Sequence, residues 1–273
     1  MKHARPTMKT VSYIEPNSSW MEYSMKKTAI ALALAALPPM SANADLLFTL
    51  GTKASVWNAE PAGQIDNNVS VEGDGLDIES ENGMQLTVFF EHPVPFVPNV
   101  KLKQTNLDLS GTGDVNISFL DVDFNEEVDS TLDLTHTDLT LYWGLPIPLP
   151  FVDFDFGLTA RQFDGVAEVT GKTSNVTESE DLNFTLPMGY GAINVTTPFG
   201  LYASADINYI SASGNKLSDI SYLLGYELPI PVVDLGIEAG YRTMALETDD
   251  DLDIETDVDV SGAFFGAALS VGF

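Results

Sequence analysis

The sequence predicts an all-β chain that forms a single antiparallel transmembrane β-barrel of about ten strands, with eight as the alternative, preceded by a signal peptide. Three observations predict this fold. Apolar and polar residues alternate along most of the chain, short proline-containing turns alternate with longer polar connections, and an apolar leader precedes the first alternating segment. No run of about 18 apolar residues occurs, which excludes an ordinary transmembrane helix.

The leader has the three parts of a secretory signal peptide. Met25 starts a positively charged stretch, residues 28–37 are apolar, and a small-x-small motif ends at Ala44. We therefore expect residues 25–44 to be the signal peptide and Asp45 to be the first mature residue. The apolar run is too short for a membrane anchor.

Residues 1–24 show no periodicity and stand upstream of a complete signal, so we expect them to be a non-native extension from an over-called start codon. The outer-membrane barrel is then expected to span residues 45–273. The chain contains no Cys, which excludes disulfide scaffolds, thiolate zinc sites and Cys nucleophiles. Export without Cys suits the Gram-negative envelope, where folding need not wait for disulfides.

Alternation of period two predicts the strands of the barrel. In 232–246, for example, Ile237 belongs to an apolar face and Glu238 to a polar face. Gly, Thr and β-branched residues interrupt every candidate helix. The facing of Lys101 and Lys103 stays ambiguous. The predicted strands are 45–57, 84–91, 99–109, 135–144, 152–163, 182–195, 200–210, 217–228, 232–246 and 262–273.

The connections alternate in kind along the chain. Proline marks the short turns, which are 93–98, 146–150, 198–200 and 229–231. Long polar loops are expected at 58–82, 110–130, 164–181 and 247–259, and a short polar one at 211–216. Short turns on one side and long loops on the other are typical of an outer-membrane barrel with periplasmic turns and extracellular loops.

A secreted β-sandwich is the main alternative, because its strands alternate too. Several predicted strands are longer than is usual in a sandwich, and they match the length of tilted membrane strands. Aromatic residues that suit interfacial girdles lie near strand ends on the apolar face: Phe48, Phe90, Trp143, Phe154, Tyr209, Tyr226, Tyr241, Phe265 and Phe273. These features favour the barrel.

The chain ends inside its last predicted strand. Gly266, Leu269, Val271 and Phe273 resemble the C-terminal signal that the barrel-assembly machinery reads. Together with the signal peptide and the Pro-x-Pro turns at 93–95, 146–148 and 229–231, this end makes residues 45–273 resemble the small proteobacterial outer-membrane β-barrel proteins, a class of largely unassigned function. The resemblance implies an outer-membrane location and a single-chain barrel, and it implies no particular substrate.

The polar face is expected to line the lumen and to carry a charge network. A ten-stranded barrel is narrow and largely filled by side chains, so buried charges must pair. We expect Lys53, Arg161 and Arg242 to meet acidic residues across the lumen. Two interpretations stay open: a network that only rigidifies the barrel, and a narrow water-filled path that prefers cations. The predicted network comprises Lys53, Glu91, Asp153, Asp155, Arg161, Asp206, Glu227, Glu238 and Arg242.

Dense acid in the loops suggests divalent cations. Clustered carboxylates suit Ca²⁺, but the sequence has neither EF-hand spacing nor a glycine-rich calcium repeat. We expect no cofactor beyond weakly bound divalent ions, which would bridge the loops to anionic lipopolysaccharide. The residues for a weak calcium site are Asp249, Asp250, Asp251, Asp253 and Glu255.

The sequence gives little support for an enzyme. Only His92 and His136 remain after the leader, and His136 shares a strand face with Asp138, a pairing that is usually a structural hydrogen bond. No nucleophile elbow, phosphate loop or metalloprotease helix occurs. With a net charge of −28, nucleic acid is not an expected partner.

The predicted function is therefore a structural or interaction role in the cell envelope. The alternatives are a small cation-preferring, porin-like channel and a calcium-dependent surface-binding protein. The expected partners are outer-membrane lipid, lipopolysaccharide and, during biogenesis, the barrel-assembly machinery. The sequence sets no oligomeric state.

Overall fold

The computed structural model describes residues 48–65, 69–73, 75–119, 122–147, 149–212, 215–230, 233–247 and 256–273. The chain divides into two units, Met1–Asn43 and Ala44–Phe273, and every described residue belongs to the second. The predicted extension, signal peptide and cleavage site between Ala44 and Asp45 lie outside the described residues. In the described part, no helix is long and apolar enough to cross a membrane.

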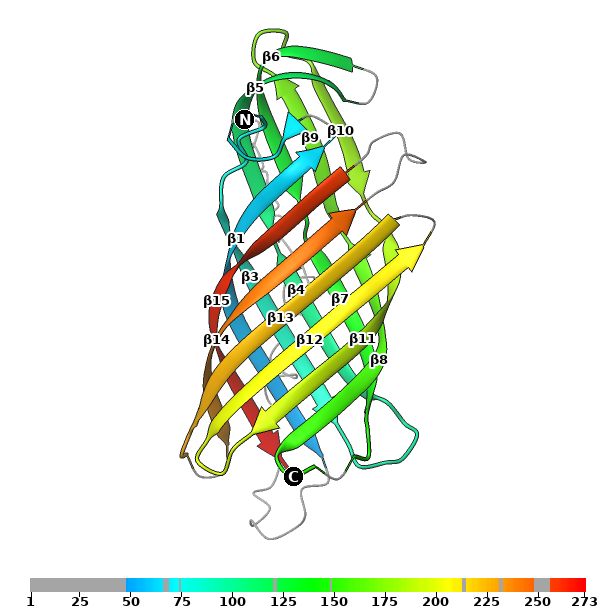
Figure 1. The fold of residues 1–273 in the computed structure, drawn as a ribbon, viewed down its shortest axis with the longest axis vertical. Helices are drawn as coiled ribbons and strands as arrows, with labels where there is room; N and C mark the ends of the chain where they lie inside the picture. Colours follow the sequence, from blue (N-terminus) through cyan, green and yellow to red (C-terminus); the bar gives the residue numbers. More distant parts are fainter. Residues whose placement is uncertain are drawn as a thin grey trace, which may run out of the picture. The chain divides into compact units, whose positions relative to one another are not determined.

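Ten strands close into one antiparallel barrel, which confirms the predicted fold class and the count of ten rather than eight (Figure 1). Neighbouring strands pair in chain order, and the last pairs back with the first. The barrel strands are β1 (Thr49–Ile65), β3 (Glu81–Glu91), β4 (Asn99–Asn106), β7 (His136–Gly144), β8 (Val152–Phe163), β11 (Thr185–Thr196), β12 (Leu201–Ala212), β13 (Asn215–Leu228), β14 (Asp234–Glu247) and β15 (Thr256–Gly272).

The closing seam joins β1 to β15. Their register runs from Thr49 opposite Gly272 to Ile65 opposite Thr256, and it satisfies backbone groups that would otherwise form two open edges. Phe48 and Phe273 extend the seam by exchanging two backbone hydrogen bonds of 3.0 Å. The Phe48 ring also stacks on the Phe273 ring, with centroids 5.8 Å apart. The C-terminal residue is thus part of the closure.

The two faces of the barrel strands differ as the alternation predicts. On β13, the side chains of Tyr222 and Leu224 are 57% and 71% exposed, whereas Ser221, the residue before Tyr222, is buried. On β14, Ile237 is exposed and Glu238 is buried. The barrel is therefore apolar outside and polar inside, the reverse of a soluble protein.

Two of the predicted loops are instead hairpins, so the loop predictions for 110–130 and 164–181 are wrong. β5 (Asp108–Phe119) pairs with β6 (Val122–Asp133), and β9 (Gly165–Gly171) pairs with β10 (Thr177–Leu182). They form a second sheet in the order β10-β9-β6-β5, here called the small sheet. It lies beyond the barrel rim at the end opposite the C-terminus (Figure 1). The density of acid in these segments hides an alternation of Val115, Ile117 and Phe119 that suffices for a strand.

The barrel strands are also longer than the sequence indicates at this end. β1 continues to Ile65, where β2 (Val69–Ser70) pairs with it, so 58–82 is only partly a loop. β14 reaches Glu247 and β15 begins at Thr256, which shortens the predicted 247–259 loop from both sides. The backbone hydrogen bonds between neighbouring strands continue at this end although the side chains are polar there, because each strand already has its partner beside it.

A buried apolar cluster lies where the small sheet meets the barrel. The sheet turns one face inward, including Leu109, Phe124 and Val128, and these pack with barrel residues such as Trp57 and Val260. All five are at most 1% exposed. Burial of each large apolar side chain stabilises the fold by about 1.5–3 kcal/mol. The small sheet is therefore attached to the rim by a hydrophobic core like that of a soluble protein.

Candidate functional site

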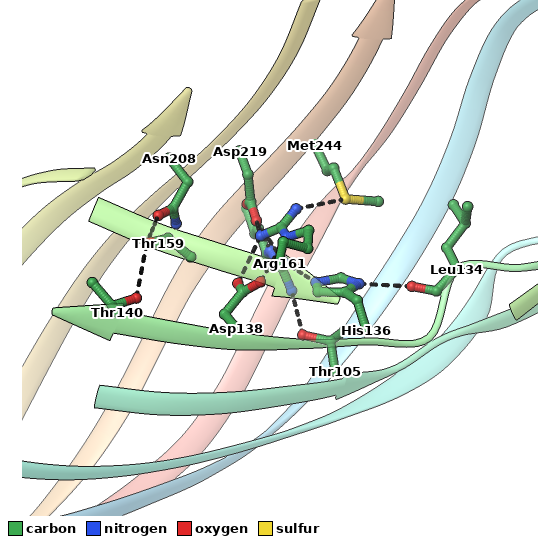
Figure 2. A network of polar contacts seen from close by, with 11 residues as sticks. Thr105, Leu134, His136, Asp138, Thr140, Thr159, Arg161, Asn208, Asp219 and Met244 are labelled. Atoms are coloured by element: carbon green, nitrogen blue, oxygen red, sulfur yellow. Dashed lines mark hydrogen bonds and ion pairs between the residues drawn. The ribbon is translucent and has the colours of Figure 1, made fainter. Parts of the chain in front are cut away.

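Two arginines and two aspartates form an ion cluster across the lumen, here called the Arg–Asp cluster (Figure 2). From β8, Arg161 Nε and Nη2 donate to Asp138 Oδ1 and Oδ2 at 2.7 and 2.8 Å. From β14, Arg242 Nε and Nη2 donate to Asp219 Oδ1 and Oδ2 at 2.8 and 2.7 Å. Arg161 Nη2 also donates to Asp219 Oδ2, which joins the two bidentate pairs.

The other guanidinium nitrogens of the cluster have partners as well. Arg242 Nη1 donates to Thr105 Oγ1 at 3.0 Å, and Arg161 Nη1 lies 3.4 Å from the sulfur of Met244. The guanidinium of Arg242 lies 4.7 Å from the centre of the Trp57 ring. Both arginines are fully buried. Since each buried charge has a partner, the cluster can exist in the interior of the barrel, away from water.

His136 contributes to this cluster as a neutral hydrogen-bonding group. Its Nδ1 lies 2.7 Å from the carbonyl oxygen of Leu134, and its Nε2 lies 3.1 Å from Arg242 Nη2. The geometry assigns the proton to Nδ1, which donates to the carbonyl, while Nε2 accepts from the arginine. The expected His136–Asp138 hydrogen bond is therefore wrong: each of the two side chains binds an arginine instead.

The ligand atoms of His136, Asp138 and Asp219 lie within 4.8 Å of one another, a spacing that a metal ion could use. Both carboxylates, however, already accept hydrogen bonds from guanidinium groups. A divalent cation would stand beside two buried positive charges and would have to displace these donors. The donor set fits the arginines and does not fit a metal.

A second polar layer lies beside the cluster. Thr140 Oγ1 and Thr159 Oγ1 are 2.8 Å apart, and Thr159 donates to Asn208 Oδ1 at 2.6 Å (Figure 2). All three side chains are buried. This chain of hydrogen bonds ties β7, β8 and β12 together across the lumen.

The other half of the lumen contains a cavity of about 400 Å³ that reaches the short-turn end of the barrel, here called the lumen cavity. Several of its charged groups are paired. Lys53 Nζ lies 2.7 Å from Glu238 Oε1, and Tyr202 donates to the same oxygen at 3.0 Å. Gly225 and Gly236 make room for the Tyr202 side chain, since a Cβ at either would lie within 2.4 Å of one of its atoms.

The predicted lumen residues separate into three groups. Arg161 and Arg242 form the Arg–Asp cluster. Asp153 is exposed as the second residue of β8, so its predicted place in the network is wrong: alternation gives the direction of a side chain but not its depth. The other predicted residues all line the lumen cavity: Lys53, Glu91, Asp155, Asp206, Glu227 and Glu238.

The acids that pair with the arginines are missing from the predicted network. Asp219 shares the inward face of 217–228 with Leu217, opposite to the outward face that carries Ile220. Alternation alone therefore identifies it as a lumen residue. For Asp138, the sequence indicates only a pairing with His136 on the same strand face. The lumen cavity also includes Lys101 and Lys103, which settles their ambiguous facing.

The remaining predicted site residues divide between the last strand and an undescribed segment. Gly266 pairs with Ser55 and Glu238 inside the barrel wall, whereas Leu269 and Phe273 are 44% and 37% exposed. Val271 pairs with Leu50 at the seam. The proposed calcium residues, Asp249, Asp250, Asp251, Asp253 and Glu255, lie outside the described residues.

The outer face of the small sheet carries its own ion pairs. Lys172 Nζ lies 2.7 Å from Glu127 Oε1 and 3.1 Å from Asp129 Oδ1, and these hydrogen bonds raise the pKa of Lys172. Glu126 accepts hydrogen bonds from the backbone N–H groups of Thr173 and Ser174. Hydrogen bonding from Ser174 above all lowers the pKa of the Glu126 carboxyl.

Fold and site together define a closed, ten-stranded, antiparallel β-barrel with an apolar exterior and a charged interior. No protein-family model matches the sequence, and no curated protein matches it. Among solved structures, the translocator domain of the autotransporter NalP from Neisseria meningitidis is similar at 10% identity and a TM-score of 0.42, covering 94% of this chain and 98% of that one.

Two other solved barrels are similar at the same low level. The transport unit of the autotransporter AIDA-I from Escherichia coli has 9% identity and a TM-score of 0.40, over 92% of this chain and 98% of that one. Neisserial surface protein A has 13% identity and a TM-score of 0.26, over 83% and 97%. Likenesses this weak establish neither a family nor a function for the chain.

Proposed function

We propose that the protein is an integral outer-membrane β-barrel of a Gram-negative bacterium with a structural or interaction role in the cell envelope. The observation that carries this proposal is the inside-out polarity of the barrel. Leu158 and Leu224 are 66% and 71% exposed on the outside, while Arg161 and Arg242 are fully buried inside. Lipid is the solvent in which such an exterior is stable.

The orientation of the barrel follows from the two kinds of connection. The short turns and the C-terminus would lie on the periplasmic side, and the small sheet would face the outside of the cell. Its outward-facing side chains include Asp114, Asp123, Glu127 and Asp129. Lipopolysaccharide bridged by divalent cations, or a protein partner, would meet this acidic surface.

The buried contacts inside the lumen favour a structural role over a channel. The Arg–Asp cluster joins strands across the lumen, and a buried apolar cluster packs between the small sheet and the barrel. An ion on this route would have to displace buried, bidentate ion pairs. We therefore keep the cation-preferring channel as the alternative that conductance would test.

We also propose that the protein is not an enzyme. Of the groups with catalytic potential, His136 uses both ring nitrogens on Leu134 and Arg242. Asp138 and Asp219 are held by guanidinium groups. No side chain of this cluster is free to accept a proton from a substrate.

Cell fractionation tests the proposal, with the leader left in place for export. The protein should be recovered in the outer membrane, and unboiled samples should migrate differently from boiled ones in detergent gels because the barrel resists unfolding. Recovery as a soluble periplasmic protein with identical migration before and after boiling would overturn the proposal.

A further inference from the structure

The lumen cavity lies inside the barrel and is a candidate binding pocket. Its lining extends from Ser221, which pairs in register with Arg242 of the Arg–Asp cluster, to Thr49, Glu91 and Asp234 at the short-turn end of the strands. Its volume of about 400 Å³ is in the range that small-molecule sites occupy.

Most polar groups of the wall already satisfy one another. Lys53 is paired with Glu238, Tyr142 donates to Glu91 at 2.8 Å, and Asn194 donates to Asp155 at 2.9 Å. These groups need no ligand, and they hold the wall in place.

Three donors on one part of the wall are not satisfied in this way. Gln85 is 5% exposed, yet its Nε2 has no hydrogen-bond partner in the described protein. Among the described residues, Lys103 forms neither a hydrogen bond nor an ion pair, and Lys101 donates one hydrogen bond, of 2.9 Å, to Tyr190. A buried donor without an acceptor is costly, so such a group marks a place where an acceptor is expected.

The register brings these donors together. On β3 and β4, Gln85 pairs with Thr105 and Thr87 pairs with Lys103, so Gln85 and Lys103 are diagonal neighbours on the lumen face. Lys101 is two residues further along the same face of β4. The Lys101 ammonium also lies 4.1 Å from the centre of the Tyr190 ring, which fixes its position.

One acid of the wall stays unpaired and faces the two lysines. Asp206 on β12 forms no hydrogen bond or ion pair with described residues, and it acts electrostatically on both Lys101 and Lys103. A ligand seated between them would therefore present an anionic group to the lysines and Gln85, and a hydroxyl or ammonium group to Asp206.

We propose that the lumen cavity binds a small organic anion, a carboxylate or a phosphate ester that also carries a hydroxyl or ammonium group, through Gln85, Lys101, Lys103 and Asp206. The acidic residues at its mouth, Glu227 and Asp234, disfavour anions that lack such a compensating group. The ligand enters from the short-turn end, where Glu227 and Asp234 line the cavity.

Isothermal titration calorimetry of the folded barrel in detergent, at about 150 mM salt, tests this inference with three probes. O-phosphoethanolamine offers both groups, inorganic phosphate only the anion, and ethanolamine only the cation. We expect saturable binding of O-phosphoethanolamine, weaker binding of phosphate and none of ethanolamine. No saturable heat with any probe, or tightest binding of ethanolamine, would overturn the proposal.

Two substitutions locate the site, and a third is the control. Lys103→Met should weaken binding of O-phosphoethanolamine by about tenfold or more, since it removes a charged hydrogen bond, and Gln85→Met should weaken it less. Neither change leaves a protein partner unpaired, so both variants should keep the wild-type difference in migration between unboiled and boiled samples. Lys216→Met removes the same charge from the rim ion pair with Glu247 and should leave binding unchanged. Equal affinity of Lys103→Met and wild type would refute the assignment.

Discussion

Asp219 is the residue on which the Arg–Asp cluster depends most, and Asp219→Asn tests its role. Its carboxylate accepts two hydrogen bonds from Arg242 and a third from Arg161. Asparagine has the same shape, but its Nδ2 would point donor hydrogens at guanidinium groups that are donors too. The variant would leave two fully buried arginines with Asp138 as their one carboxylate.

Breaking a buried pair by removing one partner costs about 3–5 kcal/mol, because the charge left behind stays buried and uncompensated. The m-value in urea for a chain of this size is about 3 kcal/mol per molar, so the unfolding midpoint should fall by about 1–2 M. Urea unfolding of the barrel in lipid vesicles, followed by Trp fluorescence, measures this shift.

Asp206→Asn is the matched control, since it makes the same substitution in the same lumen at an acid without an ion pair. It should change the free energy of unfolding by less than about 1 kcal/mol. Equal effects of the two substitutions, or a loss below about 1 kcal/mol for Asp219→Asn, would refute the reasoning that the cluster is a connected ion network.

Three further predictions follow from the same structure. Planar-bilayer recordings should show no conductance steps in any salt, because an ion would have to displace the buried ion pairs of the Arg–Asp cluster; steps selective for cations would establish the channel. The lowered pKa of Glu126 means that its bonds to Thr173 and Ser174 stabilise the β9–β10 turn above the ordinary Glu pKa and are lost as pH falls through the folded-state value. The amide resonances of these two residues should follow that titration, and Glu126→Gln should abolish it. Calcium titration should give a weak, non-saturating change in melting temperature, whereas a saturable shift removed by Asp251→Asn would assign a specific site.

The alternation in the sequence was enough to predict the barrel, because each barrel strand has one lipid-type face and one polar face. Ile237 and Glu238 are adjacent and end up on opposite sides of the wall. The count of ten follows from the same pattern. The small sheet does not follow from composition, because its strands carry Asp and Glu on the outer face and dense acid is typical of a loop. Val115 and Phe124, both buried, show that the alternation continued there.

The site was predictable in kind but not in its pairings. Alternation tells which residues enter the lumen, and Arg161 and Arg242 were found that way. Arg161 meets Asp138 directly opposite it on the neighbouring strand, whereas its contact with Asp219 depends on the stagger and tilt of strands that are far apart in the sequence. The same limit explains Asp153. Alternation predicts that its side chain points to the lumen face, but not that it lies at the exposed end of β8.

The direct test of an apolar exterior facing lipid uses two adjacent leucines on β13. Leu224 is 71% exposed on the outside, and Leu223 lines the lumen cavity. The chain has no Cys, so Leu223→Cys and Leu224→Cys each give a single site for a nitroxide spin label. In vesicles, the label at 224 should collide readily with oxygen, which concentrates in lipid, and poorly with a water-soluble nickel chelate, while the label at 223 should not show that preference. Equal accessibility at the two positions, or free access of the nickel chelate to the label at 224, would contradict the membrane barrel.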